Sequence, residues 1–130
     1  MTASLRAFLA SLGVALLVQG LASWALDASG NAGNEMPYRF ANADPRHALI
    51  HVVWGGAILV LLVRGLDHRG CVRLALAFGA FYSALAVLGL FVHHPLGLRL
   101  DRGENVFHLL VGPITLAVGV VALRGERAPA

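Results

Sequence analysis

The sequence predicts an all-α integral membrane protein, a four-helix bundle made of two pseudo-repeated helical hairpins. The chain has 130 residues, of which 58% are hydrophobic and 13% are charged. Soluble domains carry roughly 25% charged residues, so a soluble fold of this size would expose too much apolar surface. Four near-continuous apolar stretches without β-type alternation favour transmembrane helices over a barrel.

Each apolar stretch approaches the length of about 20 residues that a helix needs to cross a bilayer core roughly 30 Å thick. The predicted helices cover about 5–26, 47–64, 72–92 and 104–123 within a single transmembrane domain, 1–130. The first stretch has an alternative interpretation as a signal peptide, with "MTASLR" as its charged start and "ASWALDA" as a cleavage region. Its length, which exceeds that of an ordinary signal core, favours a helix that is retained.

The second and fourth helices begin with clear start signals. Asp44 is a typical N-cap, and Pro45 suits the first helical position. Asp101 with Glu104 three residues later has the pattern of a capping box. In the fourth helix Gly112 and Pro113 predict close packing and a bend, and Gly55 occupies the matching position in the second helix.

Arginine counts predict the orientation. Six arginines lie on the side of both termini, against four on the other side, so both termini are expected to face the cytoplasm. The expected location is a bacterial inner membrane, with the lipid bilayer and other membrane subunits as partners. Trp24, Trp54, Phe78 and Phe81 are expected on exposed faces, where they would contact lipid or a neighbouring subunit.

The second and fourth stretches look like two copies of one phrase, "DPRHALIHVVWG" and "DRGENVFHLLVG", which begin 57 residues apart. Aligning His51 with His108 also aligns Gly55 with Gly112. The first and third stretches match more weakly, through Arg6 with Arg73 and Gly13 with Gly79. Halves of about 1–66 and 67–130 are therefore predicted, related by an axis along the membrane normal.

This arrangement resembles a family of small four-helix bacterial membrane proteins that is catalogued only as a domain of unknown function. The resemblance rests on Asn105, His108 and Gly112 in the second half and on His51 and Gly55 in the first. Ala48 stands where the first half would carry the asparagine. The resemblance implies a fold and a bacterial inner-membrane location, and it implies no activity.

Histidines are the candidate functional residues, and three interpretations compete for His51 and His108. The two imidazoles would hydrogen-bond between helices and pin the hairpins together. Alternatively, they would be axial ligands of a haem or a bacteriochlorophyll. In the third interpretation, histidines and carboxylates at this end form a zinc or copper site. The histidines expected for that site are His47, His51, His93 and His94, and a proton relay or transport is a remaining alternative.

The sequence favours a structural or accessory subunit of a larger membrane complex, with a tetrapyrrole- or metal-binding protein as the alternative. An enzyme is not expected, because Tyr82 and Ser83 lie in the middle of a helix with no histidine within one turn. The arginines form no basic stripe, which argues against nucleic-acid binding. Cys71 is the single cysteine, which excludes an internal disulfide.

Overall fold

Four helices dominate the computed structural model, which describes residues 2–29, 44–92, 97–98 and 102–127. They are α1 (Thr2–Ala28), α2 (Pro45–Val63), α3 (His68–Phe91) and α4 (Arg102–Arg127), and the described residues contain no strand. Each helix is long and apolar enough to cross a membrane. The predicted all-α class is therefore confirmed, and each helix begins and ends within a few residues of its apolar stretch.

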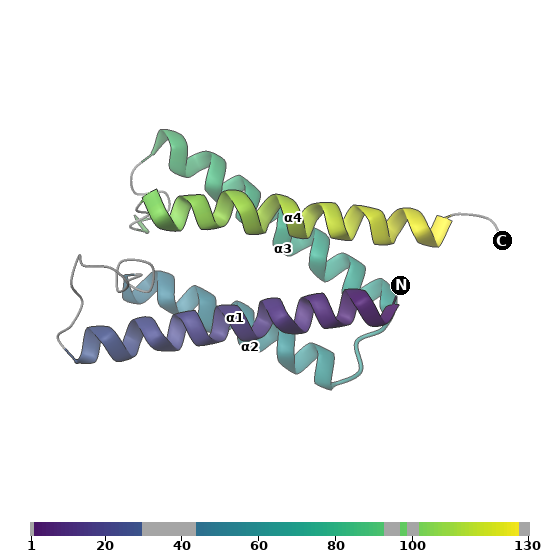
Figure 1. The fold of residues 1–130 in the computed structure, drawn as a ribbon, viewed down its shortest axis with the longest axis horizontal. Helices are drawn as coiled ribbons and strands as arrows, with labels where there is room; N and C mark the ends of the chain where they lie inside the picture. Colours follow the sequence, from purple (N-terminus) through teal and green to yellow (C-terminus); the bar gives the residue numbers. More distant parts are fainter. Residues whose placement is uncertain (1, 30–43, 93–96, 99–101, 128–130) are drawn as a thin grey trace.

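Two antiparallel hairpins make up the bundle: α1 packs on α2, and α3 packs on α4, while α1 and α3 share a smaller contact. The hairpins lie beside one another in Figure 1, and the beginning of α1 and the end of α4 lie at the same end of the molecule. The helix contacts within each hairpin are therefore much more extensive than the contacts between the hairpins.

Glycines allow the close approach within each hairpin. A Cβ atom on Gly55 of α2 would lie 2.7 Å from the carbonyl oxygen of Gly13 in α1. A Cβ atom on Gly112 of α4 would lie 2.6 Å from the backbone nitrogen of Ser83 in α3. Both separations are too short for any side chain, so these backbones pack directly on one another, as small residues permit in membrane helices.

Caps define the ends of α2. Asp44 accepts hydrogen bonds from the backbone N–H groups of Arg46 and His47, which confirms its role as N-cap. The other end closes with a Schellman motif, in which Gly65 adopts φ +82° and the Leu66 N–H donates to the Leu61 carbonyl. The Arg6 guanidinium of α1 donates to the carbonyls of Leu62 and Leu66 and so fixes α1 against this end.

The outer faces of the helices are apolar and exposed. Val53, Val121 and Phe91 are between 60% and 80% exposed. A soluble monomer rarely exposes contiguous apolar surface on this scale, whereas lipid tails cover it in a membrane. The exposed faces therefore suit contact with lipid.

Aromatic side chains pack together inside the bundle. The Trp54 ring of α2 meets the Phe78 ring of α3 edge-on, with centroids 5.4 Å apart, and Phe78 stacks on Tyr82 at 4.3 Å. Phe78 and Tyr82 are completely buried. The expectation that Phe78 lies on an exposed face was wrong, because this residue joins α3 to the second helix of the other hairpin.

Candidate metal centre

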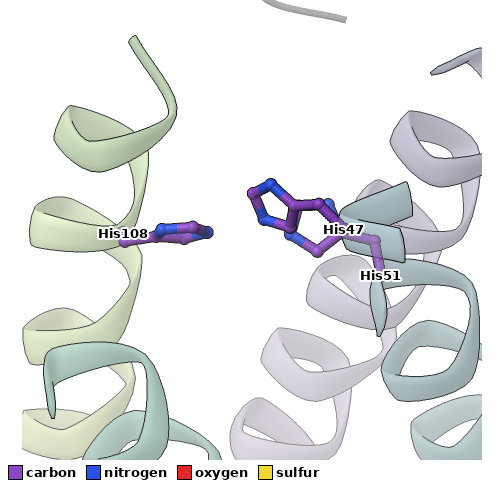
Figure 2. Close-up of side chains that lie close together, drawn as sticks. All are labelled: His47, His51 and His108. Atoms are coloured by element: carbon purple, nitrogen blue, oxygen red, sulfur yellow. The ribbon is translucent and has the colours of Figure 1, made fainter. Parts of the chain in front are cut away.

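Three histidines from two helices converge inside the bundle. His47 and His51 lie four residues apart on α2 and share one face of it, and His108 comes from α4. Figure 2 shows the three side chains pointing toward one another across the space between these helices. One ring nitrogen from each histidine lies within 4.8 Å of the other two. All three side chains are buried, with 0% to 1% of their surface exposed.

The helix starts set the depth of this cluster. His51 and His108 each lie six residues after the first residue of their helix. The Asp44 cap fixes the first turn of α2, and because His47 follows it by three residues, its ring lies inside that turn. The cluster therefore lies near the end of the bundle where α2 and α4 begin.

The three rings meet at steep angles. The centroids of His47 and His51 are 4.5 Å apart with 70° between the planes, and those of His47 and His108 are 5.1 Å apart at 50°. The centroids of His51 and His108 are 6.0 Å apart at 87°. The histidines thus form a triangle of rings rather than a stack.

Two polar side chains orient the histidines of α2. The Nδ1 atom of His51 donates a hydrogen bond to Oε1 of Gln19 in α1. An amide oxygen only accepts, so Nδ1 carries the proton and Nε2 of the neutral ring carries the lone pair. The Gln19 contact lies within the first hairpin and does not link it to the second. The sequence did not single out Gln19, although it is a polar residue within an apolar stretch.

Glu104 joins the hairpins at this site. Its Oε1 atom in α4 lies 3.3 Å from Nδ1 of His47, and the two side chains are 5% and 1% exposed. The distance is that of an ion pair, although the two atoms do not meet the geometry of a hydrogen bond. A carboxylate beside Nδ1 favours a proton on that atom, which again leaves the lone pair on Nε2. Glu104, predicted only as a helix-start residue, therefore also contacts a histidine of α2.

Several ring nitrogens have no hydrogen-bond partner among the described residues. They are both nitrogens of His47, Nε2 of His51, and both nitrogens of His108. A buried polar atom without a partner costs about 1–3 kcal/mol. Five such atoms lie on three neighbouring rings, and one of them, Nδ1 of His47, is at ion-pair distance from Glu104. A bound ligand would stabilise this set.

Other predicted residues lie at or outside this site. Asn105 precedes His108 by one turn, is 8% exposed, and its side-chain oxygen has no partner in the described part of the chain. Pro113 lies inside α4, one residue after the close contact at Gly112. The metal-ligand candidates His93 and His94 and the capping residue Asp101 lie outside the described residues.

A cavity of about 420 Å³ lies elsewhere, between the beginning of α1 and the end of α4. Its lining is almost entirely apolar and includes Leu5, Phe8, Val118 and Val121. No histidine or carboxylate lines it, so it offers no ligand to a metal or to a haem iron.

Comparison with known proteins adds no relative: no family model, no curated protein and no solved structure matches the chain. The candidate site therefore rests on the structure alone. It consists of three buried histidines, of which His51 contacts an amide and His47 a carboxylate.

Proposed function

We propose that this chain is an integral membrane four-helix protein that binds one divalent transition-metal ion through His47, His51 and His108. The observation that carries the proposal is the convergence of three buried imidazoles whose Nε2 atoms have no partner among the described residues. Neutral imidazole suits zinc, copper, iron and nickel, and by affinity Zn²⁺ and Cu²⁺ are the leading candidates.

The distances fit a metal ion after a small adjustment. Zinc–nitrogen bonds of about 2.0–2.1 Å in tetrahedral geometry place ligand nitrogens about 3.4 Å apart. The ring nitrogens already lie within 4.8 Å of one another. Metal binding would therefore require these nitrogens to approach one another by up to about 1.4 Å.

The partners of His47 and His51 also fit a metal site. A metal-bound histidine usually donates its second N–H to a carboxylate, an amide or a carbonyl, which fixes the ring and its tautomer. Gln19 does this for His51, and Glu104 is placed to do it for His47. The Glu104 carboxylate also supplies negative charge that lowers the cost of a buried cation.

A single ion is favoured over a tetrapyrrole. A haem held by His51 and His108 would need a wide, flat space between the two rings. The His47 ring lies 4.5 Å from the His51 ring and 5.1 Å from the His108 ring, so a third imidazole occupies the neighbourhood of that space. The cavity of about 420 Å³ between α1 and α4 is lined by other residues.

Contacts between matched positions support the proposed two-hairpin repeat. Positions 47 and 104, like 51 and 108, are 57 residues apart, and each pair meets across the bundle. Residues related by a twofold axis touch one another only close to that axis. The proposed metal site therefore lies on the pseudo-twofold axis. The two halves contribute unequally: the first supplies His47 and His51, whereas the second supplies His108 and has Glu104 at the position that matches His47.

The glycine contacts support the same repeat in α1 and α3. Gly55 packs on Leu17 of α1, and Gly112 packs on Ser83 of α3. Leu17 and Ser83 are 66 residues apart, as are Gly13 and Gly79. Arg6 and Arg73 are 67 residues apart, one more than the other matched pairs of α1 and α3. These two arginines also have different surroundings. Arg6 caps α2, whereas Arg73 is exposed.

The excess of arginine on the side of the termini supports a chain with both termini in the cytoplasm of a bacterial cell. In that orientation the histidine cluster lies toward the non-cytoplasmic surface, and its metal comes from that side. The exposed apolar faces suit lipid and the neighbouring subunits of a larger complex, in which the chain would act as a metal-binding accessory protein.

Equilibrium dialysis against Zn²⁺, with elemental analysis of the full-length protein in detergent, tests the proposal. We expect one ion per chain, and a loss of affinity greater than 100-fold in both His47→Ala and His108→Ala, since removal of an outer partner alone costs 10–100-fold. His68→Ala is the matched control, because His68 begins α3 and lies outside the cluster. Binding that is equally strong in all three variants would rule out this site, and its absence from the wild type would favour a purely structural role for the histidines.

A further inference from the structure

The proposed metal site has three protein ligands, which is fewer than a metal ion such as zinc requires. In the described part of the chain, the side chains that converge within bonding reach of one ion are His47, His51 and His108. Glu104 does not belong to that group, because its contact is to Nδ1 of His47, on the ring edge away from Nε2. Zinc and related ions take at least four ligands, and sites with three protein ligands keep an open position.

The charge of the site indicates what fills this position. Three neutral imidazoles leave the charge of a divalent ion unchanged, and Glu104 offsets one unit of it. One positive charge then remains in surroundings that are almost completely buried, where an uncompensated ion is costly. A small monovalent anion bound to the ion would remove this charge.

The ring of Tyr82 lies beside the site, and its hydroxyl is a potential hydrogen-bond donor. Its ring lies 5.0 Å from that of His108 and 6.0 Å from that of His51, measured between centroids. The residue is completely buried, and its hydroxyl has no partner among the described residues. A phenol is an effective donor to an anion, and its ring is held here by stacking on Phe78.

We propose that the metal bound by the three histidines keeps one open coordination position, which takes a small monovalent anion that accepts a hydrogen bond from the Tyr82 hydroxyl. The anion is of the class of hydroxide, azide or cyanide, and it replaces a water molecule on the metal with no change in oxidation state. This inference rests on the proposed metal site, and it adds a ligand class and a residue, Tyr82, that contacts the ligand.

Azide titration of the Co²⁺-loaded full-length protein, followed by visible absorption, tests this inference. We expect a saturable spectral change with a stoichiometry of one azide per cobalt. Tyr82→Phe keeps the ring and should weaken azide binding by about tenfold or more, the usual effect of losing a hydrogen bond to a charged group, while the cobalt affinity stays unchanged. Ser83→Ala is the matched control, since it removes a neighbouring buried hydroxyl of α3 that packs on Gly112, and its azide affinity should equal that of the wild type.

The outcomes separate the two proposals. If cobalt does not bind, the proposed function fails. If one cobalt binds and azide leaves the spectrum unchanged, the open position is overturned, while the metal site stands. If azide binds equally to the wild type and to Tyr82→Phe, the role of the phenol is overturned.

Discussion

Two adjacent glycines of α2 offer a sharp test of the close approach between α1 and α2. A Cβ atom on Gly55 would lie 2.7 Å from the Gly13 carbonyl oxygen and 2.7 Å from the Leu17 nitrogen. A Cβ atom on Gly56 would meet nothing within 4 Å. Alanine at either position gains the same helix propensity, so Gly56→Ala is a matched control for Gly55→Ala.

The distances give the expected magnitude. An ordinary contact begins at 3.4 Å, so Gly55→Ala requires α1 and α2 to separate by roughly 0.7 Å at this point. A gap of 0.5–1 Å forfeits about a quarter to a half of the dispersion energy of each contact, and overpacking costs about 1–3 kcal/mol. Helix propensity favours alanine by about 0.5–1 kcal/mol in both variants. We therefore expect Gly56→Ala to be slightly more stable than the wild type, and Gly55→Ala to be less stable than Gly56→Ala by about 1–3 kcal/mol.

The assay is reversible unfolding by SDS in mixed micelles, followed by tryptophan fluorescence, because Trp54 packs between the hairpins against Phe78. Gly55 follows His51 by one turn, so the displacement should also weaken metal binding in Gly55→Ala and not in Gly56→Ala. Equal stability of the two variants would refute the proposed backbone contact. Gly112→Ala should repeat the penalty of Gly55→Ala, since its Cβ atom would lie 2.6 Å from a backbone nitrogen of α3.

Two further predictions concern charged side chains. Glu104→Gln should lower the affinity for Zn²⁺ by about 10–100-fold, because the amide keeps an oxygen near His47 but removes the negative charge. Equal Zn²⁺ affinities of this variant and the wild type in equilibrium dialysis would show that the carboxylate is not coupled to the metal. Arg6→Gln should destabilise the protein by about 1.5–3 kcal/mol in SDS unfolding, since the guanidinium donates to two carbonyls at the end of α2. Arg73→Gln, at an exposed position of α3, is its control and should leave stability unchanged.

Elements of this protein that depend on local signals were predictable. Each apolar stretch has the length of a membrane-spanning helix, and Asp44 followed by Pro45 marks where α2 begins. The spacing of four residues between His47 and His51 already places both on one face of a helix. These features depend on local sequence, because the backbone hydrogen bonds of a helix join residues of the same segment.

The direction in which apolar residues face was less predictable. Phe78 was expected on an exposed face and is completely buried, while Val53 of α2 and Leu90 of α3 are 60% exposed. Lipid tails are as apolar as leucine, so hydropathy does not separate a side chain that faces lipid from one that faces another helix. Glycines are more informative, because Gly55 and Gly112 mark the places where two backbones meet.

The sequence by itself therefore determined four membrane-length helices, the cap of α2 and a pair of histidines on one face. Only the tertiary structure decided that His108 joins this pair, that Glu104 contacts His47 across the bundle, and that Gln19 orients His51. The physical reason is distance along the chain. Gln19 and His51 are 32 positions apart and meet because α1 packs on α2. His108 and Glu104 lie 57 to 61 positions from the histidines of α2 that they contact, and they meet them only when the two hairpins pack side by side. No local pattern records which faces these helices and hairpins share.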